Sequence, residues 1–290
     1  MSGRFDGQLA LVTGGSSGIG LALAQQLAGE GADVWILARR QGPLDEAAEA
    51  ISAARSRPGS RVGTLAADVA EPAEVERSLE YLTNEVGLPD LLINSAGVAK
   101  PGYAQNLELA VFDWMMAVNY FGTVYVTQTL LPAMIDRGSG YIVNIASLAG
   151  LLGVFGYTAY GASKFAVRGY SDTLRAEMKP HGLGVSLVFP PDVDTPQLAY
   201  ENQFKPPETK LLAGGAAAIS PDQAARTILN GVARGAYVII PGFEGKALYW
   251  LSGWLGTAVY PLMDIAVRWA RRRAAESGGH PMNGSTEGVS

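Results

Sequence analysis

Seven short apolar runs, separated by longer amphipathic stretches, constrain the fold of this chain more than any other feature. The runs are Leu9–Thr13, Val34–Ala38, Val62–Ala66, Leu91–Asn94, Tyr141–Ile145, Val185–Phe189 and Tyr237–Ile240. Runs this short that are apolar on both faces are typical of strands buried inside a parallel sheet. Parallel neighbours need crossover connections, which the helical stretches between the runs supply. The pattern therefore predicts a doubly wound α/β fold with one parallel seven-stranded sheet.

The chain has 290 residues, 48% of them hydrophobic, which is enough for one large core. We expect a single domain over residues 1–245 and an apolar helical tail over residues 246–275. Residues 276–290 are rich in Gly and Ser and are predicted to be disordered.

A long segment interrupts the alternation after the sixth predicted strand. Ser220-Pro221-Asp222-Gln223 is typical of a helix start, so we expect a helix over residues 221–234. The segment before it contains a Pro pair and a Gly pair. Because so long a loop in a compact domain usually has a function, we predict a lid over the substrate at about residues 191–219.

Composition excludes several kinds of site. The net charge of −5 gives no general attraction to nucleic acid. The chain has no Cys, so disulfides and Cys nucleophiles are excluded, and its two His, His181 and His280, are too few for a His-rich metal site. We therefore expect no metal. Residues Met1 to Gln8 are polar and the next apolar run is short, so we expect no signal peptide and a cytoplasmic protein.

A glycine-rich turn follows the first predicted strand and opens a helix. Glycines in this context let the backbone approach a pyrophosphate, and the helix start supplies free N–H donors. The turn predicts dinucleotide binding on a Rossmann-type sheet. The expected contacts are Gly14, Ser16, Ser17, Gly18, Ile19 and Gly20.

The residues after the second strand bear on which dinucleotide binds. An NAD site usually has an acidic residue there, whereas this chain has Arg39 and Arg40. A guanidinium can bind a 2′-phosphate, so we predict NADPH/NADP⁺; the alternative is that the two Arg only end the strand with solvated charge. Asp68 and Val69, after the third strand, are predicted to contact adenine. The region around Asp68 could also begin the next helix, and the two roles can coexist.

Tyr160 and Lys164 lie four residues apart on a predicted helix and therefore on one face. A Tyr has an ordinary pKa of about 10, too high for efficient proton exchange at neutral pH. A neighbouring ammonium is expected to lower that pKa. Ser147, thirteen residues before Tyr160, and Asn119 accompany the pair. Together these residues predict a reductase.

With these motifs the chain resembles the short-chain dehydrogenase/reductase family over residues 5–240. The resemblance implies that Tyr160 donates the proton and that Ser147 holds the carbonyl oxygen. It implies that Lys164 lowers the phenol pKa and binds the nicotinamide ribose, while Asn119 holds a water in a proton relay. The further residues implied for the cofactor site are Asn94, Ala96 and Gly97 in one wall, and Pro190, Val193 and Thr195 beside the nicotinamide.

A narrower resemblance, to the 3-ketodihydrosphingosine reductases, comes from residues 155–169, from Pro190 to Pro196 and from residues 201–210. Most family members have Gly where this chain has Pro191. This resemblance implies a long-chain lipid ketone as substrate, reduced by NADPH. The alternatives are another ketone of the steroid, retinoid or acyl type, and a non-catalytic NADP-binding scaffold.

Asp192 replaces an uncharged residue of the common family turn. A 3-ketosphinganine carries an ammonium next to its ketone, and we predict that Asp192 pairs with it. The alternatives are an Asp that caps the following turn or one that bonds only to the lid backbone.

The predicted tail has an uncharged, aromatic stretch from Ala247 to Met263, followed by clustered Arg from Arg268. This pattern favours a segment in the cytoplasmic leaflet of a membrane; the alternative is packing on the core or on a partner subunit. The apolar helices expected near residues 109–135 and 157–179 resemble the pair that forms dimers in this family. We therefore expect a homodimer or homotetramer, with a monomer as the alternative.

Overall fold

The computed structural model describes residues 3–213 and 217–276 of the chain. The segment for which disorder is predicted, residues 276–290, lies outside the described residues except for Glu276, which ends the last helix.

One seven-stranded parallel sheet organises the molecule, as predicted. Its strands are β1 (Leu9–Thr13), β2 (Asp33–Ala38), β3 (Val62–Ala66), β4 (Leu91–Asn94), β5 (Gly140–Ile145), β6 (Leu183–Val188) and β7 (Val238–Ile239). The strand order is β3-β2-β1-β4-β5-β6-β7, and every neighbouring pair is parallel. The order reverses between β1 and β4, and in such sheets a ligand crevice forms beyond the carboxyl ends of the strands at that point.

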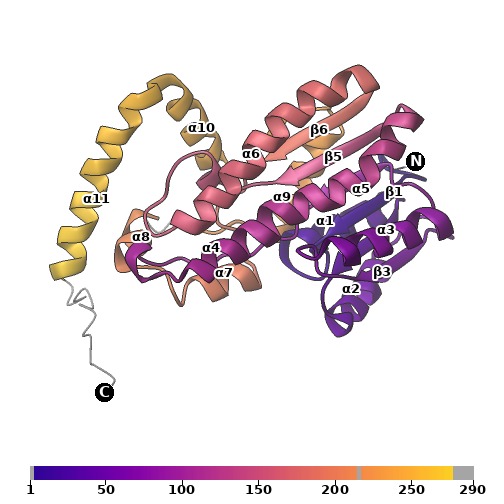
Figure 1. Cartoon of the computed structure of the whole chain (residues 1–290), viewed down its shortest axis with the longest axis horizontal. Coiled ribbons are helices and arrows are strands. Elements are labelled where there is room, and N and C mark those ends of the chain that lie inside the picture. Colours follow the sequence, from indigo (N-terminus) through magenta and orange to yellow (C-terminus); the bar gives the residue numbers. More distant parts are fainter. Residues whose placement is uncertain (1–2, 214–216, 277–290) are drawn as a thin grey trace.

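Helices cover both faces of the sheet. The longer ones are α1 (Gly18–Gly29), α2 (Gln41–Ala53), α3 (Pro72–Glu85), α4 (Leu109–Met115), α5 (Gly122–Arg137), α6 (Thr158–Met178) and α9 (Pro221–Val232). Side chains of α1, α2 and α9 form one core with the sheet, and side chains of α3, α5 and α6 form a second core on the opposite face. Figure 1 shows α5 and α6 running together across that second face.

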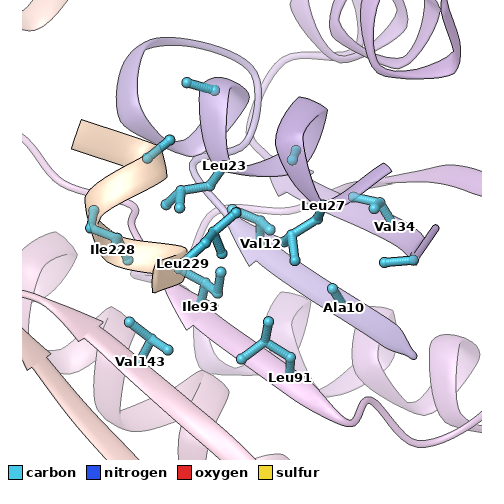
Figure 2. Close-up of a cluster of buried hydrophobic side chains, with 14 of the residues drawn as sticks. Ala10, Val12, Leu23, Leu27, Val34, Leu91, Ile93, Val143, Ile228 and Leu229 are labelled. Atoms are coloured by element: carbon cyan, nitrogen blue, oxygen red, sulfur yellow. The ribbon is translucent and has the colours of Figure 1, made fainter. Parts of the chain in front are cut away.

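The core under α1 and α9 shows what one face of the strands packs against. Val12 of β1 and Ile93 of β4 lie between Leu23 of α1 and Leu229 of α9 (Figure 2). All four side chains are fully buried. Burying each of these side chains contributes roughly 1.5–3 kcal/mol of transfer free energy. This packing holds β1 and β4, whose carboxyl ends reach the site, in place.

The segment predicted as a lid folds into two short helices, α7 (Pro196–Glu201) and α8 (Pro207–Leu212). Its two ends are joined, since the Asp194 amide donates to the Ile219 carbonyl at 3.0 Å and the Ile219 amide donates to the Asp192 carbonyl at 3.1 Å. The segment therefore begins and ends at one pair of backbone hydrogen bonds. Its function as a lid stays a prediction, and we call it the lid below.

The tail forms two helices, α10 (Phe243–Leu255) and α11 (Val259–Glu276), joined by a 3₁₀ turn at Gly256–Ala258. The chain reverses at this turn, and α11 packs against α8 (Figure 1). The predicted boundary at residue 245 falls inside α10. This helix is attached to the domain, since its Tyr249 packs on Phe189 of the third core cluster. The aromatic stretch is therefore not one continuous helix.

Within the described residues, one helical stretch, Leu109–Arg137, is long and apolar enough to cross a membrane by length and composition alone. Its Val126, Leu130 and Met134 are buried in the core beneath α5. Of its most apolar 18-residue window, 33% is buried inside the protein.

Candidate active site

A cavity of about 860 Å³ opens where the strands end. Its walls include the residues that directly follow the first five strands, namely Gly14, Arg39, Ala67, Ser95 and Ala146. Residues 190–193, shortly after β6, complete this part of the wall. The lid and the first turn of α10 close the other side. The sequence-predicted cofactor turn and the Tyr160 motif therefore meet in one space.

The glycine-rich turn is shaped by close backbone approach. Gly14 has a φ of +67°, and a Cβ there would lie 2.8 Å from the Ala96 Cα. A Cβ at Gly20 would lie 2.3 Å from the Gly14 carbonyl oxygen. Ser17 precedes α1 but makes no side-chain capping bond, so its hydroxyl satisfies none of the first N–H groups of α1. The first residues of α1 line the cavity. This cradle fits the pyrophosphate of a dinucleotide.

The predicted residues of this turn, Ser16, Ser17, Gly18 and Ile19, line the cavity with Gly14 and Gly20. Thr13, the last residue of β1, ties this turn's strand to the neighbouring cavity wall: its Oγ1 accepts from the amides of Ser95 and Ala96, both at 3.1 Å. Sequence reasoning missed this role of Thr13, because the residue reads only as the end of a strand.

Asn94 does not line the cavity, and its predicted part in the cofactor site stays a prediction. It is buried, and its Nδ2 donates to Thr127 Oγ1 at 3.0 Å and to Asn144 Oδ1 at 2.9 Å. Asn94 pairs with Asn144 across β4 and β5, and its amide bonds to α5 behind the sheet edge. The predicted wall is instead formed by Ala96 and Gly97.

Arg39, Arg40, Asp68 and Val69 all line one end of the cavity. Arg39 Nη1 lies 3.7 Å from Asp68 Oδ2, and both Arg side chains are exposed. Asp68 also accepts from the Ala70 amide at 3.0 Å and so stabilises the turn before α3, although it does not cap that helix. Two guanidinium groups thus stand where an NAD site would have an acid.

Tyr160 and Ser147 lie together in the cavity, and the Ser147 hydroxyl hydrogen-bonds the phenol. Ser147 holds its position because its Oγ accepts from the Ala149 amide at 3.2 Å, in the 3₁₀ turn Leu148–Gly150. The two hydroxyls that the resemblance assigns to a carbonyl oxygen are therefore adjacent.

The pKa of Tyr160 is raised above its ordinary value, chiefly by burial and then by the nearby Glu201 carboxylate; the Ser147 bond lowers it only in part. Lys164 is not among the groups that shift this pKa here, so the lowering by its ammonium stays a prediction. The Lys164 Nζ lies 5.7 Å from the Tyr160 ring centroid and donates to the Ile145 carbonyl at 3.0 Å. The phenol is therefore protonated near neutral pH and is a weaker acid in this arrangement than a free tyrosine.

Lys164 is buried in the cavity wall, and burial lowers its pKa to about 8 while Glu201 opposes the shift. A Cβ at Gly97 would lie 3.4 Å from the Lys164 Nζ and 3.3 Å from Asn119 Oδ1. The absence of a side chain at Gly97 therefore leaves room for the ammonium beside Asn119.

Asn119 is fully buried in a π-helical stretch, Met116–Phe121, and is not part of the cavity wall. Its Oδ1 accepts from the Val98 amide at 2.8 Å, while its Nδ2 donates to the Val98 carbonyl and to Ser163 Oγ, both at 2.9 Å. Ser163, which sequence reasoning missed, also donates to the Tyr160 carbonyl at 2.7 Å. The water relay through Asn119 stays a prediction.

The turn after β6 meets the glycine-rich turn across the cavity. Pro190, Val193 and Thr195 line it, and a Cβ at Gly18 would lie 3.0 Å from Thr195 Cγ2. Thr195 caps α7, since its Oγ1 accepts from the Leu198 amide at 3.2 Å.

Asp192 lines the cavity but already has a cationic partner, because Lys205 Nζ lies 3.1 Å from its Oδ2. The Asp192 side chain is 52% exposed, whereas that of Lys205 is buried. Its pairing with a substrate ammonium stays a prediction, and the structure shows that such a substrate would compete with Lys205.

Tyr157 and Glu201 are among the cavity residues that received no role from the sequence. The Tyr157 hydroxyl donates to Glu201 Oε2 at 2.7 Å, and Gln197 Nε2 donates to Glu201 Oε1 at 2.9 Å. The available signal was the four-residue spacing of Gln197 and Glu201 after a Pro at a helix start.

The sequence matches the short chain dehydrogenase family over residues 8–206. The chain belongs to that family. It is therefore an oxidoreductase that uses a nicotinamide cofactor, and the non-catalytic scaffold alternative is set aside.

Among curated relatives, the chain is 36% identical to the 3-ketodihydrosphingosine reductase of Bos taurus over 243 residues, 83% of this chain and 73% of the relative. It is 35% identical to the 3-ketodihydrosphingosine reductase of Dictyostelium discoideum, over 90% of this chain and 83% of that one. These matches confirm the narrower resemblance. It is also 33% identical to SadH of Mycobacterium tuberculosis, which carries a provisional oxidoreductase name, over 92% of this chain and 99% of that protein.

Solved structures of short chain dehydrogenases share the fold. Levodione reductase superposes with a TM-score of 0.76 and 26% identity, over 84% of this chain and 99% of that one. L-sorbose reductase from Gluconobacter frateurii, solved with NADPH and L-sorbose, gives a TM-score of 0.71 and 25% identity, over 83% and 98% of the two chains.

Proposed function

We propose that this short chain dehydrogenase reduces the 3-keto group of 3-ketodihydrosphingosine to the alcohol of dihydrosphingosine, with NADPH as reductant. The observation that carries the substrate is the similarity to reductases of that name from an animal and from Dictyostelium, over more than four fifths of the chain. The cavity that unites Ser147 and Tyr160 with the glycine-rich turn supports the reaction class.

When bound, the reduced nicotinamide supplies the hydride that adds to the carbonyl carbon. Ser147 and Tyr160 hold the carbonyl oxygen between two hydroxyls. Tyr160, which is protonated near neutral pH, gives its proton to that oxygen as the alcohol forms. The buried Lys164 ammonium then favours the phenolate that is left, and binds ribose hydroxyls.

The preference for NADPH rests on charge at the end of β2. Arg39 and Arg40 are exposed, line the cavity and have no neighbouring acid at the strand end. A guanidinium binds a 2′-phosphate through charge-assisted hydrogen bonds. The partner of Arg39, Asp68, is 3.7 Å away and only loosely engaged.

The far side of the cavity suits a lipid chain. The lid and α10 contribute seven apolar residues to its lining, beside the polar lid residues Gln197, Glu201, Lys205 and Thr209; the apolar ones are Leu198, Leu212, Ala213, Ala217, Ile219, Phe243 and Leu248. Burying a methylene group there is worth about 0.8 kcal/mol, so a long acyl chain gains affinity from this wall.

A second candidate substrate is another lipid ketone of the steroid, retinoid or acyl type. It is kept as a candidate because the match to SadH, a protein whose name gives no substrate, extends over 92% of this chain.

The two candidates are separated by following NADPH oxidation with a panel of ketones under identical detergent conditions. The panel contains 3-ketodihydrosphingosine, a steroid ketone, a retinoid ketone and a long-chain acyl ketone. We expect 3-ketodihydrosphingosine to have the highest kcat/KM. A higher value for any other ketone would replace the proposed substrate.

We further propose that the tail holds the enzyme on the cytoplasmic face of a membrane. Phe243, Trp250 and Trp254 follow one another on α10 at spacings of seven and four residues, so they share a face. Trp250 is 74% and Trp254 is 92% exposed. Phe243 also lines the cavity, so the same face borders the entrance for a lipid substrate.

The C-terminal end of α11 carries a second group of side chains suited to a membrane surface. Arg268, Arg271 and Arg272 are followed by Arg273, which lies over the Trp269 ring. Clustered Arg beside interfacial aromatic side chains attract anionic headgroups, each worth about 1 kcal/mol near the surface.

A further inference from the structure

Glu201, the last residue of α7, is a buried carboxylate in the cavity wall. It is 7% exposed, and its two bonded partners, Tyr157 and Gln197, are neutral. Among the residues that the structure describes, no Lys or Arg lies within ion-pair distance of it. Two hydrogen bonds offset part of the cost of burying a carboxylate, and a cation would offset much more.

The cations nearest along the cavity wall are already engaged. Lys205 pairs with Asp192, and Lys164 donates to the Ile145 carbonyl. The other buried lid carboxylate, Glu208, accepts from the Tyr103 hydroxyl at 2.8 Å and does not line the cavity. Glu201 is thus a buried cavity carboxylate without an ion-pair partner among the described residues, and the Lys164 ammonium acts on it only from beyond ion-pair distance.

Glu201 lies close to the reacting groups. Its partner Tyr157 is 5.6 Å from Tyr160 between ring centroids. The Glu201 carboxylate raises the pKa of both Tyr160 and Lys164, so its charge acts on the place where the carbonyl is held.

We propose that Glu201 binds a substrate ammonium group on the carbon next to the ketone that Tyr160 and Ser147 hold. The inference rests on the proposed function, since a 3-ketodihydrosphingosine carries such an amine, and it assigns to Glu201 the role that the sequence suggested for Asp192. Asp192 instead neutralises Lys205 within the lid.

The test compares two substrates, 3-ketodihydrosphingosine and the same long-chain ketone without nitrogen, in the wild type and in Glu201→Gln. Glutamine keeps the size of the side chain and an oxygen that accepts from Tyr157 but removes the charge. Any change in the Tyr160 pKa affects both substrates alike, so the ratio of their kcat/KM values isolates the ammonium. We expect kcat/KM for the amino ketone to fall about 30-fold or more relative to the nitrogen-free ketone.

Two matched variants test whether the charge or the local structure matters. Glu208→Gln removes an equally buried lid carboxylate with a Tyr partner outside the cavity, and we expect the wild-type ratio. Tyr157→Phe removes the neutral partner of Glu201 but keeps the charge, so the preference for the amino ketone should persist whatever happens to the rate.

Equal losses on both substrates in Glu201→Gln, reproduced by Tyr157→Phe, would overturn the proposal and leave Glu201 a positioning residue. A binding measurement separates this result from failure of the proposed function. If the wild type reduces neither ketone, binding of dihydrosphingosine is compared with binding of the same alcohol lacking the amine. Preference for the amine that Glu201→Gln abolishes would support the inference alone; no preference would overturn it as well.

Discussion

At the scale of single residues, the site is governed by burial. Tyr160 and Lys164 are both enclosed by the sheet edge and the lid, and burial is the largest influence on the pKa of each. The phenol is held protonated, ready to donate, while the ammonium is destabilised. The cost of enclosing Lys164 is a cost to the fold.

Replacing Lys164 with Met should therefore stabilise the protein while removing turnover. The folded-state pKa is about 8 against an ordinary 10.5. Below pH 8 the lysine is charged in both states, and its buried charge destabilises the wild type. Between pH 8 and 10.5 the folded state loses the proton first, so wild-type stability rises with pH. We expect Lys164→Met to gain about 1–2 kcal/mol at pH 7 by denaturant unfolding, and less at pH 10. A gain that grew with pH would contradict this.

Cofactor choice is a second property of single side chains. Replacing Arg39 and Arg40 together with Ala should raise the KM for NADPH much more than that for NADH, because only the former has a 2′-phosphate. Steady-state kinetics with both cofactors measure the ratio. Arg77→Ala, an exposed Arg on α3 away from the cavity, serves as the control. Equal losses for both cofactors would show that the two Arg do not bind the phosphate.

At the scale of elements, the strands were the most predictable part. β1, β3 and β4 have the predicted bounds. β1 and β4 are buried along their whole length, and a strand buried on both faces is a short apolar run in the sequence. The cap of α9 was equally local, since Ser220 Oγ accepts from the Gln223 amide at 3.1 Å.

Contacts between distant segments were not predictable in the same way. The motif containing Asn94 placed it near the cofactor but could not give the direction of its side chain, which bonds to α5 and β5. The Tyr157–Glu201 bond joins residues 44 apart and depends on how the lid folds. Burial, which sets the pKa of Tyr160, is likewise a property of the whole chain.

The two tail helices carry the prediction about membranes. Replacing Trp250 and Trp254 with Ala should reduce flotation with vesicles that contain anionic lipid, because these two side chains are the exposed tryptophans of the proposed docking face. Tyr81→Ala, an exposed aromatic residue on α3, is the matched control and should float as the wild type does. A wild type that stays out of the vesicle fraction would contradict the proposal.

At the scale of the whole molecule, we propose that two chains associate through α5 and α6. Phe121, which directly precedes α5, stacks on Tyr125 and is 41% exposed. Phe165 of α6 is 42% exposed. Exposed aromatic side chains on neighbouring helices are typical of an interface between subunits.

Analytical ultracentrifugation should give a homodimer or homotetramer for the wild type. Charged replacements, Phe121→Glu with Phe165→Glu, should shift it to the mass of one chain, since a buried unpaired carboxylate disfavours association. Thr173→Glu, on the exposed part of α6, controls for added charge. A wild type that sediments as one chain at all concentrations would refute the interface.

The central claim is that Tyr160 and a bound reduced nicotinamide together convert a long-chain amino ketone to its alcohol. It is tested most directly by mass spectrometry of the product made with NADPH deuterated at C4 of the nicotinamide. The account predicts dihydrosphingosine carrying one deuterium on C3. It also predicts that Tyr160→Phe binds NADPH as the wild type does and makes almost none of this product. An unlabelled product, or a Tyr160→Phe variant that keeps a tenth of the rate, would contradict the account.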